Sequence, residues 1–305
     1  ENVLALEIVT ADGRVIRTGG RARKSAAGYD LTRLFVGSEG TLGVVTEVTL
    51  RLYGIPEKIA AATCAFASLE GAVNTVISTI QAGIPIARIE LLDDFQITLL
   101  NTYAKLGLPP GNSLFMEFHG TEAGVREQAE MVEAIATDNG GGHFKWTTQA
   151  EESSKLWQAR HDAVWANKEN KPGWGMWPTD VCVPISRLAD VILATKEDIR
   201  KGDFCAPLLG HVGDGNFHLT IMVKPDDPAY LARVEALNDR LVERALAAGG
   251  TCTGEHGIGI GKTKFLLAEH GESVQLMQSI KQALDPLNIM NPTKIFGDAS
   301  GPKLH

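Results

Sequence analysis

The sequence predicts an α+β fold in which helices cover one face of a β-sheet. Two observations lead to this prediction: segments of alternating apolar and polar residues recur along the chain, and segments of helical periodicity separate them. The pattern leaves parallel crossovers open beside antiparallel pairing. A chain of 305 residues is long enough for two domains and a large core, and 44% hydrophobic residues are typical of globular proteins.

Charge and composition restrict the partners of the protein. The net charge of −8 and the lack of any Lys/Arg-rich run argue against nucleic acid as a ligand. No apolar run approaches the roughly 20 residues that a transmembrane helix needs. The cysteines are scattered, without a CxxC pair, which predicts buried free thiols in a reducing compartment. They are Cys64, Cys182, Cys205 and Cys252.

The first part of the chain, residues 1–56, is predicted to consist of short β segments. Because a strand is expected directly after Glu1, we expect the chain to begin inside a domain. The segments expected here are strands over 4–10 and 15–18 around an Asp12-Gly13 turn, a polar loop over 21–30, a β segment over 31–35 and an alternating strand over 44–52.

Pro56 marks a boundary, after which strands and helices alternate. Strands are expected over 59–66, 87–92, 113–119, 143–148, 179–184, 205–210 and 217–223. Helices are expected over 69–81, 93–106, 121–139, 150–167, 186–201, 227–248, 261–270 and 273–284. Thr121 is a suitable N-cap for its helix, because its hydroxyl can accept a hydrogen bond from the first turn.

Two glycine-rich segments could bring the backbone close to a ligand. Residues 37–43 hold three glycines in seven positions, which suits a phosphate or a flavin, although a plain loop of small residues has the same composition. Residues 257–263 resemble a phosphate loop but lack the first glycine of that motif, since position 256 is histidine. We expect their alternating glycines to let the backbone pass closely beneath another group.

The segment His211 to His218 is the strongest candidate for a metal site. If Asp214-Gly215 forms a two-residue hairpin turn, His211 faces His218 across the two strands. Facing residues have Cβ atoms about 5 Å apart, so both imidazoles could bind one divalent metal. Glu255 could add a carboxylate oxygen. Two histidines paired on an exposed hairpin would give the same spacing.

Two further residues could contribute to the same chemistry. His256 follows Glu255, and in a turn both could reach one cavity, with histidine serving as a proton acceptor near neutral pH. Arg160 lies on a helix with an apolar face, and its guanidinium could bind the carboxylate of an acidic substrate. A solvated Glu-His pair and a surface arginine are the alternatives.

These segments occur together in the order of a known family. They are Gly28-Tyr29-Asp30-Leu31, Gly37-Ser38-Glu39-Gly40-Thr41-Leu42-Gly43, Thr179-Asp180-Val181-Cys182-Val183-Pro184, the 211–218 segment, Gly254-Glu255-His256-Gly257 and Asn291-Pro292-Thr293-Lys294-Ile295-Phe296. The series resembles the FAD-linked 2-hydroxy-acid dehydrogenases of the vanillyl-alcohol-oxidase flavoprotein superfamily. D-Lactate dehydrogenase (cytochrome), the glycolate oxidase flavin subunit and D-2-hydroxyglutarate dehydrogenase form the group that it resembles.

The resemblance implies a domain order and a set of site residues. Residues 1–56 would end a PCMH-type FAD-binding domain, 57–270 would form a cap domain with a large antiparallel sheet covered by helices, and 271–305 would return to the FAD side. The resemblance assigns none of these residues to the subdomain that holds the FAD pyrophosphate in this family. The implied roles are general base for His256, substrate carboxylate binding for Arg160, Zn²⁺ or Mn²⁺ binding for His211, His218 and Glu255, and flavin contact for Gly37, Ser38, Gly40, Thr41, Gly43, Val45 and Asn291.

The implied reaction is the FAD-dependent oxidation of a small D-2-hydroxy acid to the 2-oxo acid. Hydroxyglutarate dehydrogenases carry a lysine where this chain has Pro178 and an asparagine where it has Thr220, so the sequence favours D-lactate over D-2-hydroxyglutarate; glycolate remains an alternative. The electron acceptor would be a cytochrome, a quinone or an electron-transfer flavoprotein, and a homodimer is compatible with the family. The expected location is the cytoplasm, with peripheral attachment to the inner membrane as an option, or the mitochondrion in a eukaryote.

Two other functions fit the same residues. A hydrolytic metalloenzyme could use a His₂-Glu site with a bound water and would need no flavin. A cap-domain fragment could instead bind metal and carboxylate without turnover.

Overall fold

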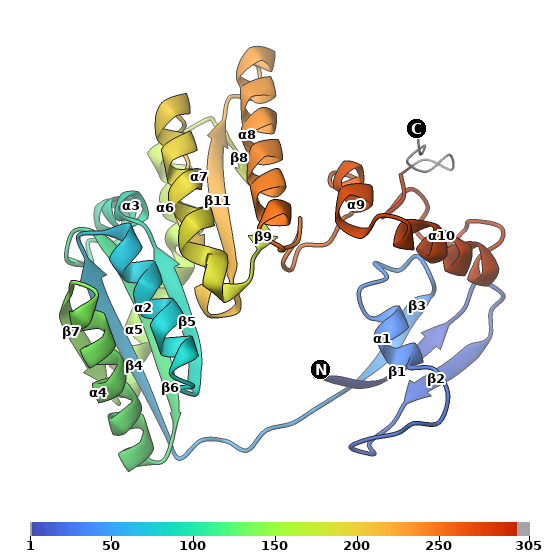
Figure 1. Ribbon diagram of the computed structural model, residues 1–305, viewed down its shortest axis with the longest axis horizontal. Coiled ribbons are helices and arrows are strands. Elements are labelled where there is room, and N and C mark those ends of the chain that lie inside the picture. The colour runs from blue at the N-terminus through green and yellow to red at the C-terminus, as the bar shows by residue number, and fades with distance from the viewer. Residues whose placement is uncertain (1, 298–305) are drawn as a thin grey trace. The chain divides into compact units, whose positions relative to one another are not determined.

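The computed structural model describes residues 2–297, and the chain forms two compact units (Figure 1). One unit combines Glu1–Ile55 with Glu255–His305, and the other comprises Pro56–Gly254. None of the helices within the described residues is long and apolar enough to cross a membrane. The assignment of residues 1–56, 57–270 and 271–305 to separate functional domains remains a prediction.

The first unit contains a small antiparallel sheet with strand order β2-β1-β3. Its elements are β1 (Val3–Val9), β2 (Val15–Gly19), α1 (Leu31–Phe35), β3 (Val44–Leu50), α9 (Thr263–His270) and α10 (Ser273–Leu284). Leu6 and Ile8 of β1 form the core with Phe35, and Leu284 of α10 packs against them. The C-terminal helix is therefore joined to the N-terminal sheet by apolar contacts.

The prediction of a β segment over 31–35 is wrong, because these residues form helix α1. The carboxylate of Asp30 accepts a hydrogen bond from the backbone N–H of Arg33 at 3.1 Å, which caps the first turn of the helix. Phe35 is 4% exposed, since the helix turns it into the core of this unit. Five residues are too few for periodicity to separate a helix from a strand.

The second unit is built on an eight-stranded sheet with the order β7-β4-β6-β5-β10-β11-β8, and β9 also pairs with β11. Its strands are β4 (Lys58–Phe66), β5 (Ile86–Leu92), β6 (Asn112–Gly120), β7 (Gly141–Thr147), β8 (Gly175–Pro178), β9 (Val181–Cys182), β10 (Leu208–Gly210) and β11 (Asn216–Val223). Every pairing between these strands is antiparallel, so the large antiparallel sheet is confirmed.

Helices cover both faces of this sheet, so the prediction that they cover one face is wrong (Figure 1). The helices are α2 (Leu69–Gln81), α3 (Asp94–Ala104), α4 (Glu122–Asp138), α5 (Ala150–His161), α6 (Ala163–Asn170), α7 (Leu188–Gly202) and α8 (Pro228–Ala247). In Figure 1, α2 and α4 lie in front of the sheet and α5 lies behind it. Residues 112–118 of the central strand β6 are all buried, as expected for a strand that is covered on both faces.

The face behind the sheet carries a core in which α3, α5 and α6 pack on three strands. Leu92 of β5, Phe115 of β6 and Leu209 of β10 contribute to this core from the sheet. The predicted single helix over 150–167 is in fact split between α5 and α6 at Asp162, where ψ is −8°. The break lets Ala163 and Ala166 pack in this core with α3.

Several local predictions agree with the structure. Thr121 caps α4 by accepting a hydrogen bond from the backbone N–H of Gly124 at 3.1 Å. The four cysteines are free thiols, and Cys64 and Cys252 are buried. Burial raises the pKa of the Cys64 thiol to about 11. Cys182 and Cys205 are only partly buried, so the expectation that all four are buried is wrong for these two.

Candidate active site

The connection between β10 and β11 differs from the predicted two-residue hairpin. Leu209, rather than His211, lies opposite His218. Residues Val212–Asp214 form a 3₁₀ turn, which Gly215 ends with a φ of +80°. The backbone N–H of Asn216 then donates to the carbonyl of His211 at 3.3 Å. The prediction assumed a turn formed by Asp214-Gly215 alone. The connection is longer because a 3₁₀ turn comes before the left-handed Gly215.

The two histidines are nevertheless brought together. His211 directly follows β10, two residues after Leu209, which lies opposite His218. Their ring centroids lie 5.6 Å apart, with the ring planes at 82°. Leu209 belongs to the core with α3, α5 and α6, and its partner His218 therefore points to the same face of the sheet.

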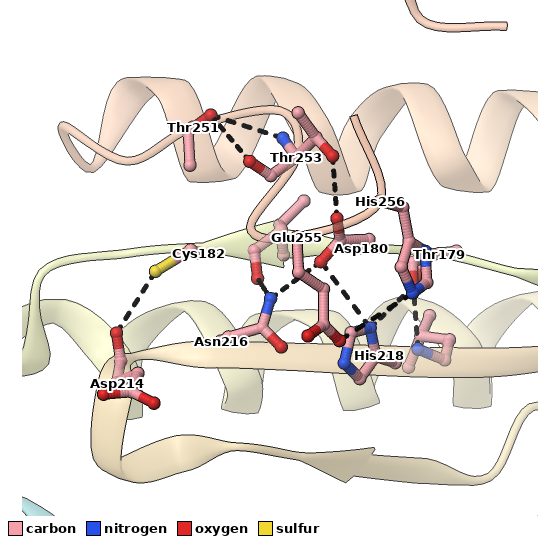
Figure 2. Close-up of polar contacts among 12 residues, drawn as sticks. Thr179, Asp180, Cys182, Asp214, Asn216, His218, Thr251, Thr253, Glu255 and His256 are labelled. Atoms are coloured by element: carbon pink, nitrogen blue, oxygen red, sulfur yellow. Dashed lines mark hydrogen bonds and ion pairs between the residues drawn. The ribbon is translucent and has the colours of Figure 1, made fainter. Parts of the chain in front are cut away.

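His218 is held by the strand interruption next to it. Its Nδ1 lies 3.0 Å from the carbonyl oxygen of Thr179 (Figure 2). Because a carbonyl only accepts, we assign the proton to Nδ1, which leaves the lone pair on Nε2. Of the predicted strand over 179–184, only Val181–Cys182 (β9) forms a strand, and Thr179 lies between it and β8, which ends at Pro178. The Thr179 hydroxyl accepts a hydrogen bond from the backbone N–H of Leu219 at 2.9 Å. A side-chain oxygen thus replaces a backbone carbonyl as the acceptor for this residue of β11.

His211 is oriented by a buried carboxylate on the neighbouring strand β5. Its Nδ1 lies 2.6 Å from Oε1 of Glu90, a residue that is 6% exposed. The other oxygen of Glu90 accepts a hydrogen bond from Nε of Arg160 on α5 at 3.2 Å and forms an ion pair with Nη2 at 3.1 Å. The structure therefore places Arg160 beside the histidine pair, with one carboxylate between them.

A second buried carboxylate, Asp180, anchors the chain that leads to Glu255. Asp180 is 1% exposed, and its Oδ1 accepts from Nδ2 of Asn216 at 2.7 Å. Its Oδ2 accepts from the Thr253 hydroxyl at 2.7 Å (Figure 2). The backbone at Gly254 lies so close to Asn216 that a Cβ at this position would be 2.0 Å from Nδ2. The chain up to Gly254 is therefore fixed on β11.

Glu255 and His256 follow directly, in a series of bends with both side chains about half exposed. Their carboxylate and imidazole lie 3.8 Å apart, from Oε1 to Nε2. Ligand atoms of His211, His218 and Glu255 lie within 4.8 Å of one another, as do those of Asp180, His218 and His256. Such spacing is suitable for one divalent metal ion with nitrogen and oxygen ligands.

Sequence reasoning did not assign roles to Glu90 or Asp180. Glu90 lies within the apolar run of a predicted strand, and a carboxylate at a position that should be buried signals a paired charge. Asp180 carries no comparable local signal, because its partners Asn216 and Thr253 are far away in the sequence.

The glycine loop over 37–43 and Asn291 are in contact within the first unit. Nδ2 of Asn291 donates to the carbonyl of Glu39 at 2.5 Å. The carboxylate of Glu39 accepts from the backbone N–H groups of Ile258 at 2.6 Å and Gly259 at 2.8 Å. The expectation that the alternating glycines bring the backbone close to another group is confirmed at Gly257, where a Cβ would lie 2.7 Å from Oε1 of Glu39.

Comparison with known proteins identifies the family. Residues 55–295 match the family described as FAD linked oxidases, C-terminal domain. The chain belongs to this family. The family resemblance of its motifs is thereby confirmed.

Relatives of this FAD-linked oxidase domain are longer proteins. It is 50% identical over 300 residues to a probable mitochondrial D-lactate dehydrogenase of Danio rerio, covering 97% of this chain and 60% of the relative. It is 45% identical to the mitochondrial D-lactate dehydrogenase [cytochrome] of Arabidopsis thaliana, covering 97% of this chain and 52% of the relative. A glycolate oxidase subunit of Bacillus subtilis is 38% identical, and the match covers 96% of this chain and 63% of the relative. The chain thus spans little more than half the length of the first two.

Two solved structures show the fold of this chain. The 4-ethylphenol oxidase from Gulosibacter chungangensis matches with a TM-score of 0.74 and 18% identity, covering 96% of this chain and 65% of that one. p-Cresol methylhydroxylase matches with a TM-score of 0.72 and 17% identity, covering 99% and 66%. These two structures establish that the fold is that of PCMH-type flavoprotein oxidases.

The predicted flavin-contacting residues of the 37–43 loop differ in how closely a ligand could approach them. Gly37 has a φ of +84°, and no described atom lies within 4 Å of where its Cβ would be, so a ligand could approach its backbone closely. At position 43, close packing rather than a ligand accounts for glycine, because a Cβ there would lie 2.7 Å from Cγ2 of Ile8. Thr41 is buried and donates to the Ser38 carbonyl at 2.7 Å, which shapes the loop itself. The loop thus offers Gly37 as its open backbone position.

Proposed function

We propose that this chain is the substrate-binding part of an FAD-dependent dehydrogenase that oxidises a D-2-hydroxy acid, foremost D-lactate, to the 2-oxo acid. The observation that carries the proposal is that Arg160 and His211 share the carboxylate of Glu90. A 2-hydroxy acid bears its carboxylate and hydroxyl on adjacent carbons. Its site must therefore place a carboxylate-binding cation next to a group that acts on a hydroxyl, and Arg160 beside the histidine pair meets this requirement.

Arg160 would bind the substrate carboxylate. Nε of Arg160 donates to Glu90 and Nη2 forms an ion pair with the same oxygen, whereas a guanidinium has five N–H donors. The remaining donors suit a carboxylate in bidentate geometry, which fixes the orientation of the molecule as well as binding it. With its side chain 14% exposed, Arg160 acts from a largely water-excluded position, where such a pair is stronger than at the surface.

His211, His218 and Glu255 would hold Zn²⁺ or Mn²⁺. Both imidazoles direct Nδ1 at an acceptor, Glu90 or the Thr179 carbonyl, which leaves Nε2 of each as the ligand atom. When bound, the metal would lower the pKa of the substrate hydroxyl by Lewis-acid polarisation. His256 would then accept the hydroxyl proton. FAD, when bound, would accept the hydride from the substrate carbon.

The substrate preference is supported by two residues that pair across strands. Pro178 of β8 lies opposite Thr220 of β11, and Thr220 is two residues from His218 on the same face. These are the positions at which the resemblance places lysine and asparagine in hydroxyglutarate dehydrogenases. Neither residue here carries a charge to bind a second carboxylate, so a monocarboxylate such as D-lactate fits better than D-2-hydroxyglutarate.

The names of three relatives support a cytochrome as the electron acceptor and the mitochondrion as the location. Three relatives are named D-lactate dehydrogenase [cytochrome], mitochondrial, with or without a number. For the protein to which this chain belongs, we infer transfer of electrons to a cytochrome and a mitochondrial location in a eukaryote. Quinone and electron-transfer flavoprotein are the alternative acceptors, and a homodimer remains a prediction.

The test is anaerobic flavin reduction by D-lactate, followed by stopped-flow absorbance in the FAD-loaded protein. We expect His256→Asn to slow flavin reduction by about 10²–10⁴-fold, the usual contribution of a general base. His270→Asn, at the end of α9, is the control and should reduce flavin at the original rate. An unchanged rate in His256→Asn would refute the role of this histidine, and a protein that is not reduced by D-lactate, glycolate or D-2-hydroxyglutarate would refute the proposed function.

A further inference from the structure

Glu90 touches both halves of the proposed site with separate oxygen atoms. Oε1 faces Nδ1 of His211 at 2.6 Å, and Oε2 faces Nε and Nη2 of Arg160 at 3.2 and 3.1 Å. The side chain is 8% exposed, so water contributes little to its hydrogen bonding. From this geometry we infer that Glu90 is a positioning residue that fixes His211 for the metal and Arg160 for the substrate carboxylate. The inference rests on the proposed function.

The effect on His211 follows from the donor and acceptor roles of imidazole. A carboxylate only accepts, so the nitrogen that faces Glu90 carries the proton. The lone pair of the neutral ring is then on Nε2, so Nε2 is the atom that can coordinate a metal. Carboxylates that hold a metal-binding histidine in this way typically raise metal affinity by about 10–100-fold.

The effect on Arg160 is to fix the plane of its guanidinium. A hydrogen bond from Nε and an ion pair of Nη2 with the same carboxylate oxygen leave the group little freedom to rotate. Burying an arginine is costly without a partner, and Glu90 supplies that charge from β5. The same carboxylate therefore sets the distance between the carboxylate-binding cation and the metal-binding histidine.

Glutamine cannot replace glutamate here without changing one of the two contacts. Its amide has one accepting oxygen and one donating NH₂ group. If the oxygen faces Arg160, the NH₂ group faces Nδ1 of His211 and favours the tautomer with the proton on Nε2. If the oxygen faces His211, the NH₂ group meets the N–H groups of Arg160, and two donors oppose each other.

The chain offers a closely matched control in Glu117 on β6. Glu117 is 8% exposed and also bridges an arginine and a histidine, with contacts of 2.7 Å to Arg88 and 2.8 Å to His119. Among the described residues, the groups able to hold a metal do not include Glu117 or His119. Glu117→Gln therefore has the same chemical change and a similar cost in stability, without the expected effect on metal binding.

The experiment is a titration of the metal-free chain with Co²⁺ and Zn²⁺, following the visible absorption of bound Co²⁺ and its displacement. We expect Glu90→Gln to weaken binding by about 10–100-fold and to alter the Co²⁺ spectrum, while Glu117→Gln binds like the original protein. In the FAD-loaded protein, Glu90→Gln should also raise the KM for D-lactate, because Arg160 loses its fixed orientation.

The outcomes separate this inference from the proposed function. If the original chain binds the metal and Glu90→Gln binds it equally well with the same spectrum, the positioning role is wrong and the proposed function is untouched. If the original chain binds neither metal, the metal-binding role of His211 and the positioning role derived from it are both overturned. Should Glu90→Gln fail to fold, Glu90→Asp keeps the charge and should show a smaller loss of affinity; no loss in this variant would also refute the inference.

Discussion

The hydroxyl of Thr253 donates a hydrogen bond of 2.7 Å to Oδ2 of Asp180. Asp180 is buried, and its other oxygen accepts from Asn216 on β11. The chain is thus anchored to the sheet two residues before Glu255. The position of the proposed ligand Glu255 and base His256 depends on this anchor, because both lie in bends rather than in a helix or strand.

We expect Thr253→Val to release this anchor and Thr253→Ser to preserve it. A hydrogen bond to a charged group contributes about 1.5–3 kcal/mol, and valine leaves Oδ2 of Asp180 without its hydroxyl partner. The free energy of unfolding should therefore fall by about 1–3 kcal/mol in Thr253→Val, measured by urea denaturation. Metal affinity should fall with it. Identical metal affinity in the two variants would show that the anchor does not position Glu255.

Substrate choice can be changed at Pro178 and Thr220. The double variant Pro178→Lys with Thr220→Asn places a cation and an amide on facing strands, where a second carboxylate could bind. We expect kcat/KM for D-2-hydroxyglutarate to rise by about 10-fold or more, the value of one charge-assisted hydrogen bond. The matched control is Pro178→Met with Thr220→Asn, which lacks the cation. If both double variants respond equally, the charge at position 178 does not select the substrate.

Gly257 should tolerate no side chain. Its φ is +82°, and a Cβ would lie 2.7 Å from the carboxylate of Glu39, which holds the 258–259 backbone. We expect Gly257→Ala to destabilise the protein by at least about 1 kcal/mol, through the left-handed backbone and the displaced carboxylate. Gly261→Ala is the control, since no described atom lies within 4 Å of its Cβ position and its φ is not positive. Equal thermal midpoints for the two variants would contradict this account.

Asp198 should make stability depend on acidic pH. Hydrogen bonds from Arg240 on α8, supported by Arg244, lower the pKa of Asp198 on α7 in spite of its partial burial. A lowered folded-state pKa means that this stabilisation is complete above the unfolded pKa of about 3.9 and is lost as pH falls through the lower folded value.

The corresponding measurement compares Asp198→Asn with the original protein in urea at pH 7 and pH 3. We expect the variant to be less stable by about 1 kcal/mol at pH 7, with a smaller difference at pH 3. Asp190→Asn is the control, an exposed carboxylate on the same helix that is expected to change little at either pH. A difference for Asp198→Asn that is the same at both pH values would refute the linkage.

The fold was predictable where local signals agree with one another. The predicted bounds 69–81 and 273–284 are those of α2 and α10, because apolar periodicity extends over three turns in each. Helix α1 and the break at Asp162 were missed, since a five-residue segment has too little periodicity and the break depends on packing with α3. The second helical layer was missed as well. The apolar sequence of β6 indicates helices on both faces of the sheet only once the strand is known to lie inside the sheet.

The sequence by itself proposed the side chains of the candidate site: the paired histidines, Glu255-His256 and Arg160 were all chosen from residue types, spacing and family resemblance. It could not give the register of the 211–218 connection, because the turn type depends on backbone angles that the Asp-Gly pair leaves open. The tertiary structure alone decided that Glu90 joins Arg160 to His211 and that Asp180 anchors Thr253. Both carboxylates contact partners about 70 or more residues away, and only the packing of α5 on the sheet and of residues 251–254 on β11 brings these partners together.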